Sequence, residues 1–446
     1  MDYLWMDQIF PCDSSISPDA NTAMTDIIPQ KLNKVCFVSL YTYPLFNPEN
    51  QSPFGGSEVR VAMITKELAR RGNLDISVIV FDHGQPHIEI IDNVRIVSWK
   101  GLYCRESVNP SGISVSLYAR AMSLISRTIT RFIQAIRPTK NQQPVFGKIG
   151  QLTIFQPDIS TYDEVDADIY VIVGNGELTA KLAYFCKRKG KKFVLLSGSD
   201  MDFDPKIKSN PSYVNSYGVS GYSMQYALEN FDLCLVQTEH QQNLLSRNFQ
   251  KKSMVIRNPV DIRPIFPRQH KPETILWVGK SDQIKRPELV LDLAEIFPQY
   301  PFTLILNLSK NEIYADCISR AKTLPNVTIL PYVPPDQIEK YFAEARLLVN
   351  TSQFEGFPNT FLQAAKYGVP IISLNVDPGG MLSQHGCGKF CEDNFEFLKN
   401  GLFELVTNKA GYQKASRNGL EYASKYHDKE KITEQYESAF LSIQKT

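Results

Sequence analysis

Short apolar runs alternate along the chain with longer segments in which apolar residues recur at helical spacing. In the first half, these runs lie at 35–40, 76–81, 169–173, 193–197 and 233–236. Apolar and polar residues also alternate over 87–99, around a turn at Asp92–Asn93. Continuous apolar runs predict strands buried on both faces. Helical spacing predicts helices between them: one capped by Ser57, and others at 177–189 and 213–230.

The alternation stops at residues 255–261, where Asn258–Pro259 predicts a hinge, and then restarts. The second half predicts strands at 274–278, 302–307, 327–330, 346–350 and 370–373. Its predicted helices lie at 286–296, 335–345 and 358–367. Residues 394–444 predict successive helices without strands. Strands that alternate with helices in this way predict two doubly wound α/β domains.

The 446 residues are too many for one core, which agrees with two domains. Residues 1–31 predict an N-terminal tail. The N-terminal domain is expected at 32–256 and the C-terminal domain at 257–427. Residues 428–446 predict a helix that packs back on the N-terminal domain.

Composition narrows the function classes. Hydrophobic residues make up 43% of the chain, charged residues 21%, and the net charge is +1. A net charge near zero gives no overall positive potential that would attract the phosphate backbone of a nucleic acid. Cys36 and Cys234 lie in apolar runs, and Cys387 and Cys391 have only His385 nearby, which is too few ligands for zinc. No apolar run reaches transmembrane length, and residues 1–31 lack the order of a signal peptide. We therefore expect a cytoplasmic protein without a metal.

Residues 114–137 predict an amphipathic helix with a basic face. Its apolar residues step by three and four, and its arginines fall roughly opposite them. Such a helix can lie on an anionic membrane surface, or it can pack on the core with its basic face in water. The second interpretation is favoured, and peripheral contact with the inner face of a membrane stays open.

The loop between the strand at 346–350 and the helix at 358–367 carries candidate ligand-binding residues. Glu355 lies in this loop, and Pro358 and Asn359 open the helix, whose free N–H groups attract anions. Asn359 and Gln363 are four residues apart and share a helix face. A carboxylate, amides and a helix N-terminus suit a ligand rich in hydroxyls and phosphates.

Ligands of doubly wound sheets bind beyond the carboxyl ends of the strands. After the strand at 274–278 come Gly279, Lys280, Lys285 and Arg286, whose cations would neutralise a diphosphate. After the strand at 327–330 comes Tyr332, which is expected against a base. In the first half, Gly55–Gly56 precedes a helix, where backbone approaches a phosphate or sugar closely or simply forms a tight turn.

Four segments carry a family resemblance. They are GGSE at 55–58, VIRNPVD at 255–261, VGKSDQIKRPE at 278–288 and FEGFPNTFLQAAKYGVPIIS at 354–373. The chain resembles the two-domain nucleotide-sugar glycosyltransferases of the GT-B fold, in particular the retaining family 4. The resemblance implies two Rossmann-like domains that face each other across a cleft.

The resemblance also implies roles. Lys280 and Lys285 would hold the donor diphosphate, and Glu355 would touch hydroxyls of the donor sugar. The other donor-binding candidates are Gly55, Gly56, Gly279, Arg286, Tyr332, Gly356, Phe357, Pro358, Asn359 and Gln363. The implied reaction is metal-independent, needs no cofactor and moves a sugar, with retention, from a nucleotide sugar (UDP favoured) to an acceptor hydroxyl. The acceptor is a glycan, lipid-linked saccharide or small metabolite, as in polysaccharide biosynthesis.

Two positions depart from the family. A second glutamate usually follows the first by eight residues, but Gln363 stands here. Many relatives also carry a histidine after the strand at 193–197. Here the stretch is Ser197–Asp204, with none of the six histidines close by, and Asp200 is the candidate for that role. Its D-x-D-x-D pattern lacks the glycine and glutamate of a calcium loop, so we expect no metal there.

Two alternatives of other classes remain. The first is a non-catalytic module that binds nucleotide sugars or glycans, suggested by Gln363 and the missing histidine. The second is another enzyme on the same scaffold, such as a sugar-nucleotide epimerase or a phosphorylase.

Overall fold

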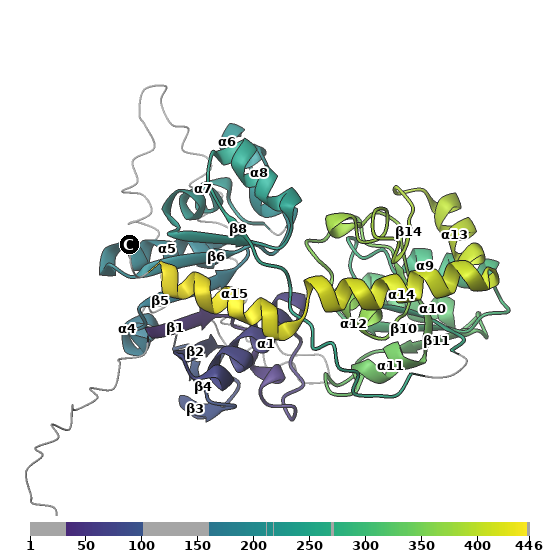
Figure 1. The fold of residues 1–446 in the computed structure, drawn as a ribbon, viewed down its shortest axis with the longest axis horizontal. Coiled ribbons are helices and arrows are strands. Elements are labelled where there is room, and N and C mark those ends of the chain that lie inside the picture. Colours follow the sequence, from purple (N-terminus) through teal and green to yellow (C-terminus); the bar gives the residue numbers. More distant parts are fainter. Residues whose placement is uncertain (1–32, 101–159, 211, 217, 269–271, 444–446) are drawn as a thin grey trace, which may run out of the picture. The chain divides into compact units, whose positions relative to one another are not determined.

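A computed structural model describes residues 33–100, 160–210, 212–216, 218–268 and 272–443 (Figure 1). The predicted tail at 1–31 and the basic helix predicted at 114–137 lie outside these residues. The described residues from Asn33 onward form one compact unit.

The first half forms an eight-stranded sheet in the order β3-β4-β2-β1-β5-β6-β7-β8. All neighbours are parallel except β3 and β4. The strands are β1 (Asn33–Val38), β2 (Leu74–Val80), β3 (Ile88–Ile91), β4 (Val94–Ser98), β5 (Ile169–Val173), β6 (Lys192–Leu196), β7 (Leu233–Val236) and β8 (Met254–Val255). The helices are α1 (Gly56–Arg71), α4 (Ser160–Val165), α5 (Glu177–Lys189), α6 (Lys206–Ser209), α7 (Gly221–Asn230) and α8 (Glu239–Phe249), with 3-10 turns η1 (Tyr43–Leu45) and η4 (Asp200–Phe203).

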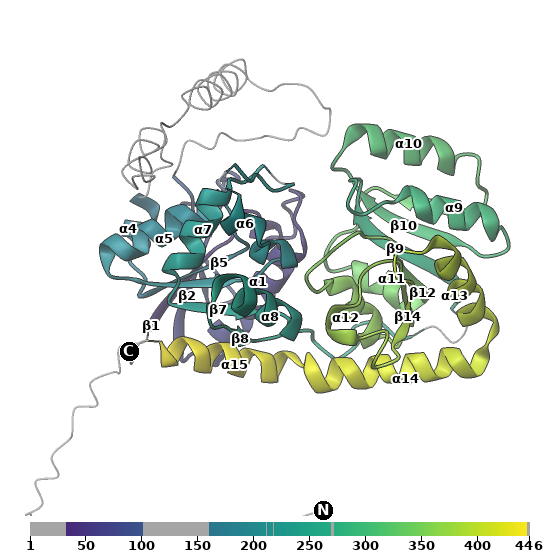
Figure 2. The same cartoon turned by 90° about the horizontal axis from the view of Figure 1, so that it is seen from above.

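Both faces of this sheet are covered, as the continuous apolar runs predict. Along β1, Val35 and Phe37 pack into one core, with α1 and the final helix, while Cys36 and Val38 pack into another, with α5, α7 and α8. Helices lie on both sides of the strands in Figure 2. Strands buried on both faces need apolar residues at every position, which explains the unbroken runs.

The second half forms a six-stranded, all-parallel sheet in the order β11-β10-β9-β12-β13-β14. The strands are β9 (Thr274–Lys280), β10 (Phe302–Asn307), β11 (Val327–Leu330), β12 (Ala345–Asn350), β13 (Ile371–Ser373) and β14 (Gly388–Phe390). The helices are α9 (Glu288–Ile296), α10 (Asn311–Ala321), α11 (Ile338–Glu344), α12 (Asn359–Lys366), α13 (Phe395–Thr407) and α14 (Lys409–Tyr426), with a 3-10 turn η5 (Pro378–Gly380). The prediction of two parallel α/β sheets is confirmed.

Some local predictions are wrong. Gly55, not Ser57, caps α1, and the Glu58 carboxylate accepts the Gly55 N–H at 2.8 Å. The helix predicted at 213–230 begins only at Gly221, because residues 214 and 220 form a β-bridge around a turn. Helices α4, α6, α8 and α10 and strands β8 and β14 were missed. In α10 only Cys317 is fully buried, while Ile313 and Tyr314 pack against the same core as partly buried residues.

The chain passes between the two sheets twice, and the two passages are hydrogen-bonded to each other. The first is the linker around Asn258, and the second is the junction between α14 and α15 (Lys429–Ser442). The Val260 N–H donates to the His427 carbonyl at 2.8 Å, and the Lys429 N–H donates to the Val260 carbonyl at 3.0 Å. Beyond this junction, Tyr436 and Phe440 of α15 pack into the core of the first sheet.

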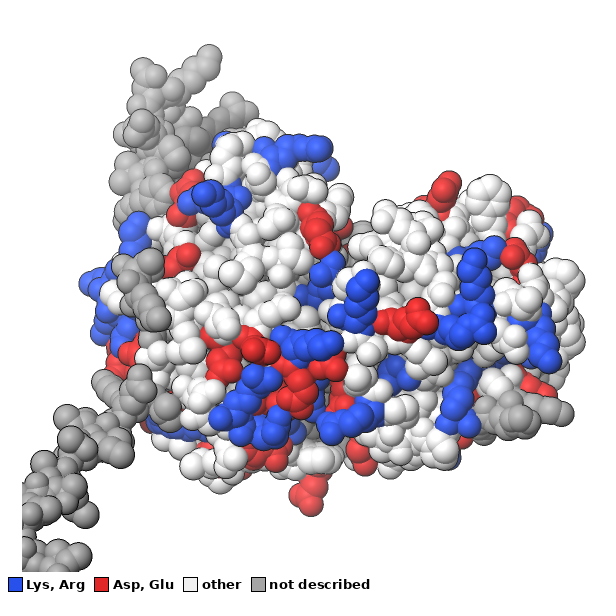
Figure 3. Space-filling model, viewed as in Figure 1, with Lys and Arg blue, Asp and Glu red and all other residues white. Residues whose placement is uncertain are grey.

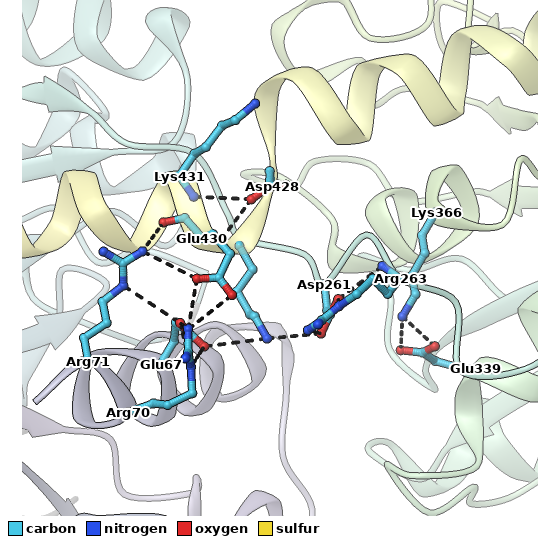
Figure 4. A network of polar contacts seen from close by, with 11 residues as sticks. Glu67, Arg70, Arg71, Asp261, Arg263, Glu339, Lys366, Asp428, Glu430 and Lys431 are labelled. Carbon is cyan, nitrogen blue, oxygen red and sulfur yellow. Dashed lines mark hydrogen bonds and ion pairs between the residues drawn. The ribbon is translucent and has the colours of Figure 1, made fainter. Parts of the chain in front are cut away.

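An ion-pair network surrounds the start of α15 (Figure 4). The carboxylate of Glu67, which is 4% exposed, accepts hydrogen bonds from Arg70 and lies 3.6 Å from the ammonium of Lys429. Lys429 also reaches Asp261 of the linker at 3.1 Å. Burial alone would raise the pKa of Glu67, but Arg70 and Lys429 lower it overall. Figure 3 shows charges of both signs gathered where α1 and α15 meet, so this network ties α1, α15 and the linker together.

No helix in the parts of the chain that the structure describes is long and apolar enough to cross a membrane.

Histidine 427 makes the stability of the fold depend on pH. Burial lowers its pKa to about 3, although its ring Nδ1 lies 2.7 Å from the Asn258 carbonyl. The folded state therefore keeps the ring neutral, whereas the unfolded chain takes up a proton below about pH 6.5. Its contribution is present above that pH and is lost as the pH falls toward 3.

Between pH 7 and pH 5, this residue should lower the free energy of unfolding by about 2 kcal/mol. Denaturant unfolding at both pH values measures the difference. His427→Asn, which keeps a donor but cannot titrate, should remove that share of the pH dependence. An equal loss on acidification in wild type and variant would contradict the assignment.

Candidate functional site

The loop after β12 is fixed by the loop after β9, its neighbour in the sheet. The Thr351 hydroxyl donates to the Lys285 carbonyl at 2.7 Å and accepts from the Trp277 indole at 3.0 Å. The guanidinium of Arg286 donates to the Thr351 carbonyl at 2.7 Å and pairs with Asp393 at 2.8 Å. Arg286, predicted to bind the donor, is thus engaged with its own domain.

Glu355 and Lys285 form an ion pair, with Nζ and Oε2 2.8 Å apart. The other carboxylate oxygen accepts from the Asn350 amide at 3.0 Å and from the Ser352 hydroxyl at 2.7 Å. The Glu355 side chain is only 16% exposed. Burial would raise its pKa, but Lys285 and the two hydrogen bonds lower it overall. The site therefore holds an ionised carboxylate whose spare lone pairs can accept hydroxyl groups.

Lys280 and Asn359 from the second sheet meet the Gly55–Gly56 loop of the first. The ammonium of Lys280 lies 3.6 Å from the point that a β-carbon on Gly55 would occupy. The Asn359 amide donates to the Gly56 carbonyl at 2.7 Å. Gly55 also opens the 16-residue helix α1, whose N-terminus adds a partial positive charge. An ammonium beside a helix N-terminus favours an anion.

Gly356, the residue after Glu355, lies against the first sheet's loops. A β-carbon there would come within 2.5 Å of the Gly198 carbonyl oxygen and of the Gln237 amide oxygen. The neighbouring Ser197 carbonyl accepts from Arg60 at 2.8 Å and from Gln237 at 3.0 Å, so this surface is fixed. Glycine is the residue that fits here.

Glycine is required at position 279 for a different reason than at position 356. A β-carbon there would meet the Trp277 ring at 2.7 Å, so its small size accommodates that indole. Tyr332 follows β11, which lies two strands from β9 at the sheet edge, and burial raises its pKa. Gln363 of α12 is half-buried, and within the described residues its amide has no hydrogen-bond partner.

The three aspartates at 200–204 point to different partners. The Asp202 carboxylate accepts from the N–H groups of Gly198 and Asn175, at 2.6 and 3.0 Å. Asp204 accepts from the Tyr213 hydroxyl at 3.1 Å. Among the residues that the structure describes, no cluster of three or more ligand side chains for a metal ion comes together.

The expectation that no histidine lies near Asp200 is wrong. His240, at the start of α8, places its Nε2 3.6 Å from the Asp200 carboxylate. Burial raises the pKa of Asp200, and Gln241 and His240 oppose that change. The residues are far apart in sequence, but β6 and β7 are neighbouring parallel strands, so their carboxyl-end loops meet. The adjacency of β6 and β7 was the feature from which the proximity of His240 to Asp200 could have been predicted.

Asn258 is a site residue that the sequence analysis treated only as a hinge. Its side chain is 2% exposed and donates to the Phe357 carbonyl at 3.0 Å and to the Asn359 side-chain oxygen at 3.2 Å. Phe357 itself is buried against the His427 ring, with ring centroids 4.6 Å apart.

Known structures share this fold. Sucrose-phosphate synthase from Thermosynechococcus elongatus superposes with a TM-score of 0.66 at 14% identity, covering 92% of this chain and 99% of that one. HepE of Anabaena in complex with UDP and glucose has a TM-score of 0.60 at 16% identity, covering 92% and 100%. The fold is GT-B.

Residues 260–422 match the family described as glycosyl transferases group 1. An uncharacterized glycosyltransferase of Haemophilus influenzae is 25% identical over 199 residues, which are 43% of this chain and 56% of that protein. Lipopolysaccharide 1,6-galactosyltransferase of Salmonella typhimurium is 24% identical over 205 residues, covering 43% and 52%. The matched part thus spans about half the length of these relatives.

Gly356→Ala should separate the two GT-B loops that meet at this glycine. The new β-carbon would overlap the Gly198 carbonyl, and overpacking of this kind costs about 1–3 kcal/mol. Hydrogen exchange measured by mass spectrometry should rise in residues 354–360 and also in 197–203. Gly176→Ala, where a β-carbon meets nothing within 4 Å, is the control. Faster exchange confined to 354–360 would contradict the contact.

Proposed function

We propose that this protein is a glycosyltransferase that moves a sugar from a nucleotide-sugar donor, UDP favoured, to an acceptor hydroxyl. The observation that carries the proposal is the Lys285–Glu355 ion pair, whose lysine follows β9, together with Lys280 at the end of the same strand, which lies close to Gly55 at the N-terminus of α1. A fixed carboxylate recognises sugar hydroxyls, while two ammonium groups and a helix N-terminus neutralise a diphosphate. The group 1 match of residues 260–422 supports the same chemistry.

Departure of the diphosphate sets the electrostatic task. Negative charge grows on the leaving phosphate, and donors already held in place stabilise it without reorganisation. Lys285 is held by Glu355, so its ammonium does not have to be ordered during the reaction, and Lys280 lies beside the Gly55 loop. In a retaining transfer, the acceptor attacks from the face that the phosphate leaves, and the phosphate takes its proton. No metal or cofactor enters this proposal.

Asp200 and His240 are proposed to face the reacting sugar from the first sheet. Support comes from the Gly198 carbonyl, which lies against Gly356, the residue after Glu355. Gly198 is only two residues before Asp200. A carboxylate and an imidazole there offer hydrogen bonds to sugar hydroxyls opposite those of Glu355.

The names of the relatives favour a saccharide acceptor, as in polysaccharide biosynthesis. One is named a lipopolysaccharide galactosyltransferase, and another, from Bacillus subtilis, a poly(glycerol-phosphate) alpha-glucosyltransferase, 29% identical over 112 residues. Work at the cytoplasmic face of a membrane, with contact through 114–137, belongs to the same proposal.

Gln363 favours a second candidate, a module that binds nucleotide sugars without turning them over. An amide there forms neutral hydrogen bonds with a ribose, where a carboxylate would form charge-assisted ones.

A screen of nucleoside diphosphates by thermal shift, followed by incubation with the matching nucleotide sugars, separates the two candidates. Ligand that binds the folded state raises the melting temperature. An enzyme also releases sugar slowly from its donor, whereas a binding module gives the shift without release. No shift with any nucleotide would overturn both.

Lys285→Ala should lower turnover about 10²–10³-fold, the usual effect of removing one preorganised donor to a developing anion. Rates of nucleoside diphosphate release measure this. Lys399→Ala, which breaks a surface pair with Glu396, is the control and should keep the wild-type rate. A loss under about fivefold for Lys285→Ala would count against its role.

Gln363→Glu should tighten donor binding. Hydrogen bonds to charged groups contribute about 1.5–3 kcal/mol against about 1 for neutral ones, so we expect about 3–30-fold lower dissociation constants. Isothermal titration with the nucleotide found in the screen measures the change. Unchanged or weaker binding would refute the proposed ribose contact.

A further inference from the structure

Asn258 joins the linker to the donor-side loop through its side-chain amide. That amide donates to the backbone at Phe357 and to the Asn359 side chain, at 3.0 and 3.2 Å. Its oxygen is buried and, within the described residues, has no hydrogen-bond partner. The donors alone therefore set the orientation of this side chain.

The contact with Asn359 fixes which end of that second amide faces the glycine loop. Because Asn258 donates to the Asn359 oxygen, the Asn359 nitrogen is left to donate to the Gly56 carbonyl at 2.7 Å. Rotating the Asn359 amide by 180° would place its oxygen against the Gly56 oxygen and its nitrogen against the Asn258 nitrogen. Both contacts would then be repulsive.

The contact with Phe357 fixes the backbone just before α12. Holding the Phe357 carbonyl sets the plane of the peptide that enters Pro358, which has no N–H of its own. The next N–H groups, at Asn359 and Thr360, open α12. One side chain thus orients both the helix opening and the amide that reaches the first sheet.

The Asn258 backbone is also fixed. Its carbonyl oxygen lies 2.7 Å from Nδ1 of the buried His427 ring, at the second chain passage. The Asn258 side chain is therefore attached to a backbone that is itself held in place.

We propose that Asn258 is a positioning residue that sets the donor-side loop and, through Asn359, its contact with Gly56. The proposal rests on the glycosyltransferase function for its role in binding, but the positioning itself is a property of the protein without ligand.

Three variants and a double variant test it, with UDP as the probe. Asn258→Ala removes both hydrogen bonds, and Asn258→Asp keeps the volume but places acceptors against the Phe357 carbonyl. We expect both variants to bind UDP about tenfold more weakly in isothermal titration, which is near the effect of one to two lost hydrogen bonds. Asn359→Ala should weaken it similarly. The double variant Asn258→Ala/Asn359→Ala should be no weaker than either single variant.

Hydrogen exchange of the full chain without ligand gives the second readout. Residues 355–366 and 55–60 should exchange faster in Asn258→Ala and Asn258→Asp. Asn326→Ala is the matched control, because Asn326 also donates to backbone carbonyls of its own domain, including Ala294 at 2.9 Å. Its exchange in these two segments should match wild type.

The outcomes separate the two proposals. Additive losses in the double variant, Asn258→Asp binding like wild type, or unchanged exchange at 355–366 would each overturn the positioning role. If wild type itself does not bind UDP, then UDP as the donor nucleotide fails, and the exchange data still decide the positioning role.

Discussion

The carboxylate of Glu355, whose side chain is only 16% exposed, imposes the central constraint of this structure. A carboxylate removed from water is costly unless it is paired and hydrogen-bonded. Lys285 supplies the charge, and Asn350 and Ser352 supply the hydrogen bonds. Because these partners come from the ends of two adjacent strands, compensating one charge holds both loops in register. Arg286 and Thr351 reinforce the same junction.

A small residue allows these loops to meet the first sheet. Gly356 comes so close to Gly198 that a side chain would not fit, and the Lys280 ammonium lies beside Gly55. Such contacts bring a carboxylate, two ammonium groups and a helix N-terminus into one region. None of these groups is unusual alone, and the site depends on their being held together.

The sequence predicts most of what short-range pattern controls. Both sheets follow from unbroken apolar runs, and the Asp92–Asn93 turn is present with positive φ at both residues. Helix α10 was missed although Ile313, Tyr314 and Cys317 recur at helical spacing and pack into one core. His240 was missed because its proximity to Asp200 depends on strand order rather than spacing. Asn258 was assigned only a hinge role, since nothing in a linker's sequence says where its side chain points. The roles assigned to Lys280, Lys285, Glu355 and Gln363 stay predictions.

The paired chain passages at Val260 and His427 limit how the two halves of the molecule can move. Two chain segments that run side by side and are hydrogen-bonded to each other at one place resist sliding, but they still permit twisting. Motion of one half against the other is then a swivel about that place, and displacement grows with the lever arm from the pivot. Phe357, which contacts both passages, sits near the pivot and would therefore be displaced least. A ligand bound farther from the pivot would be displaced the most by this rotation.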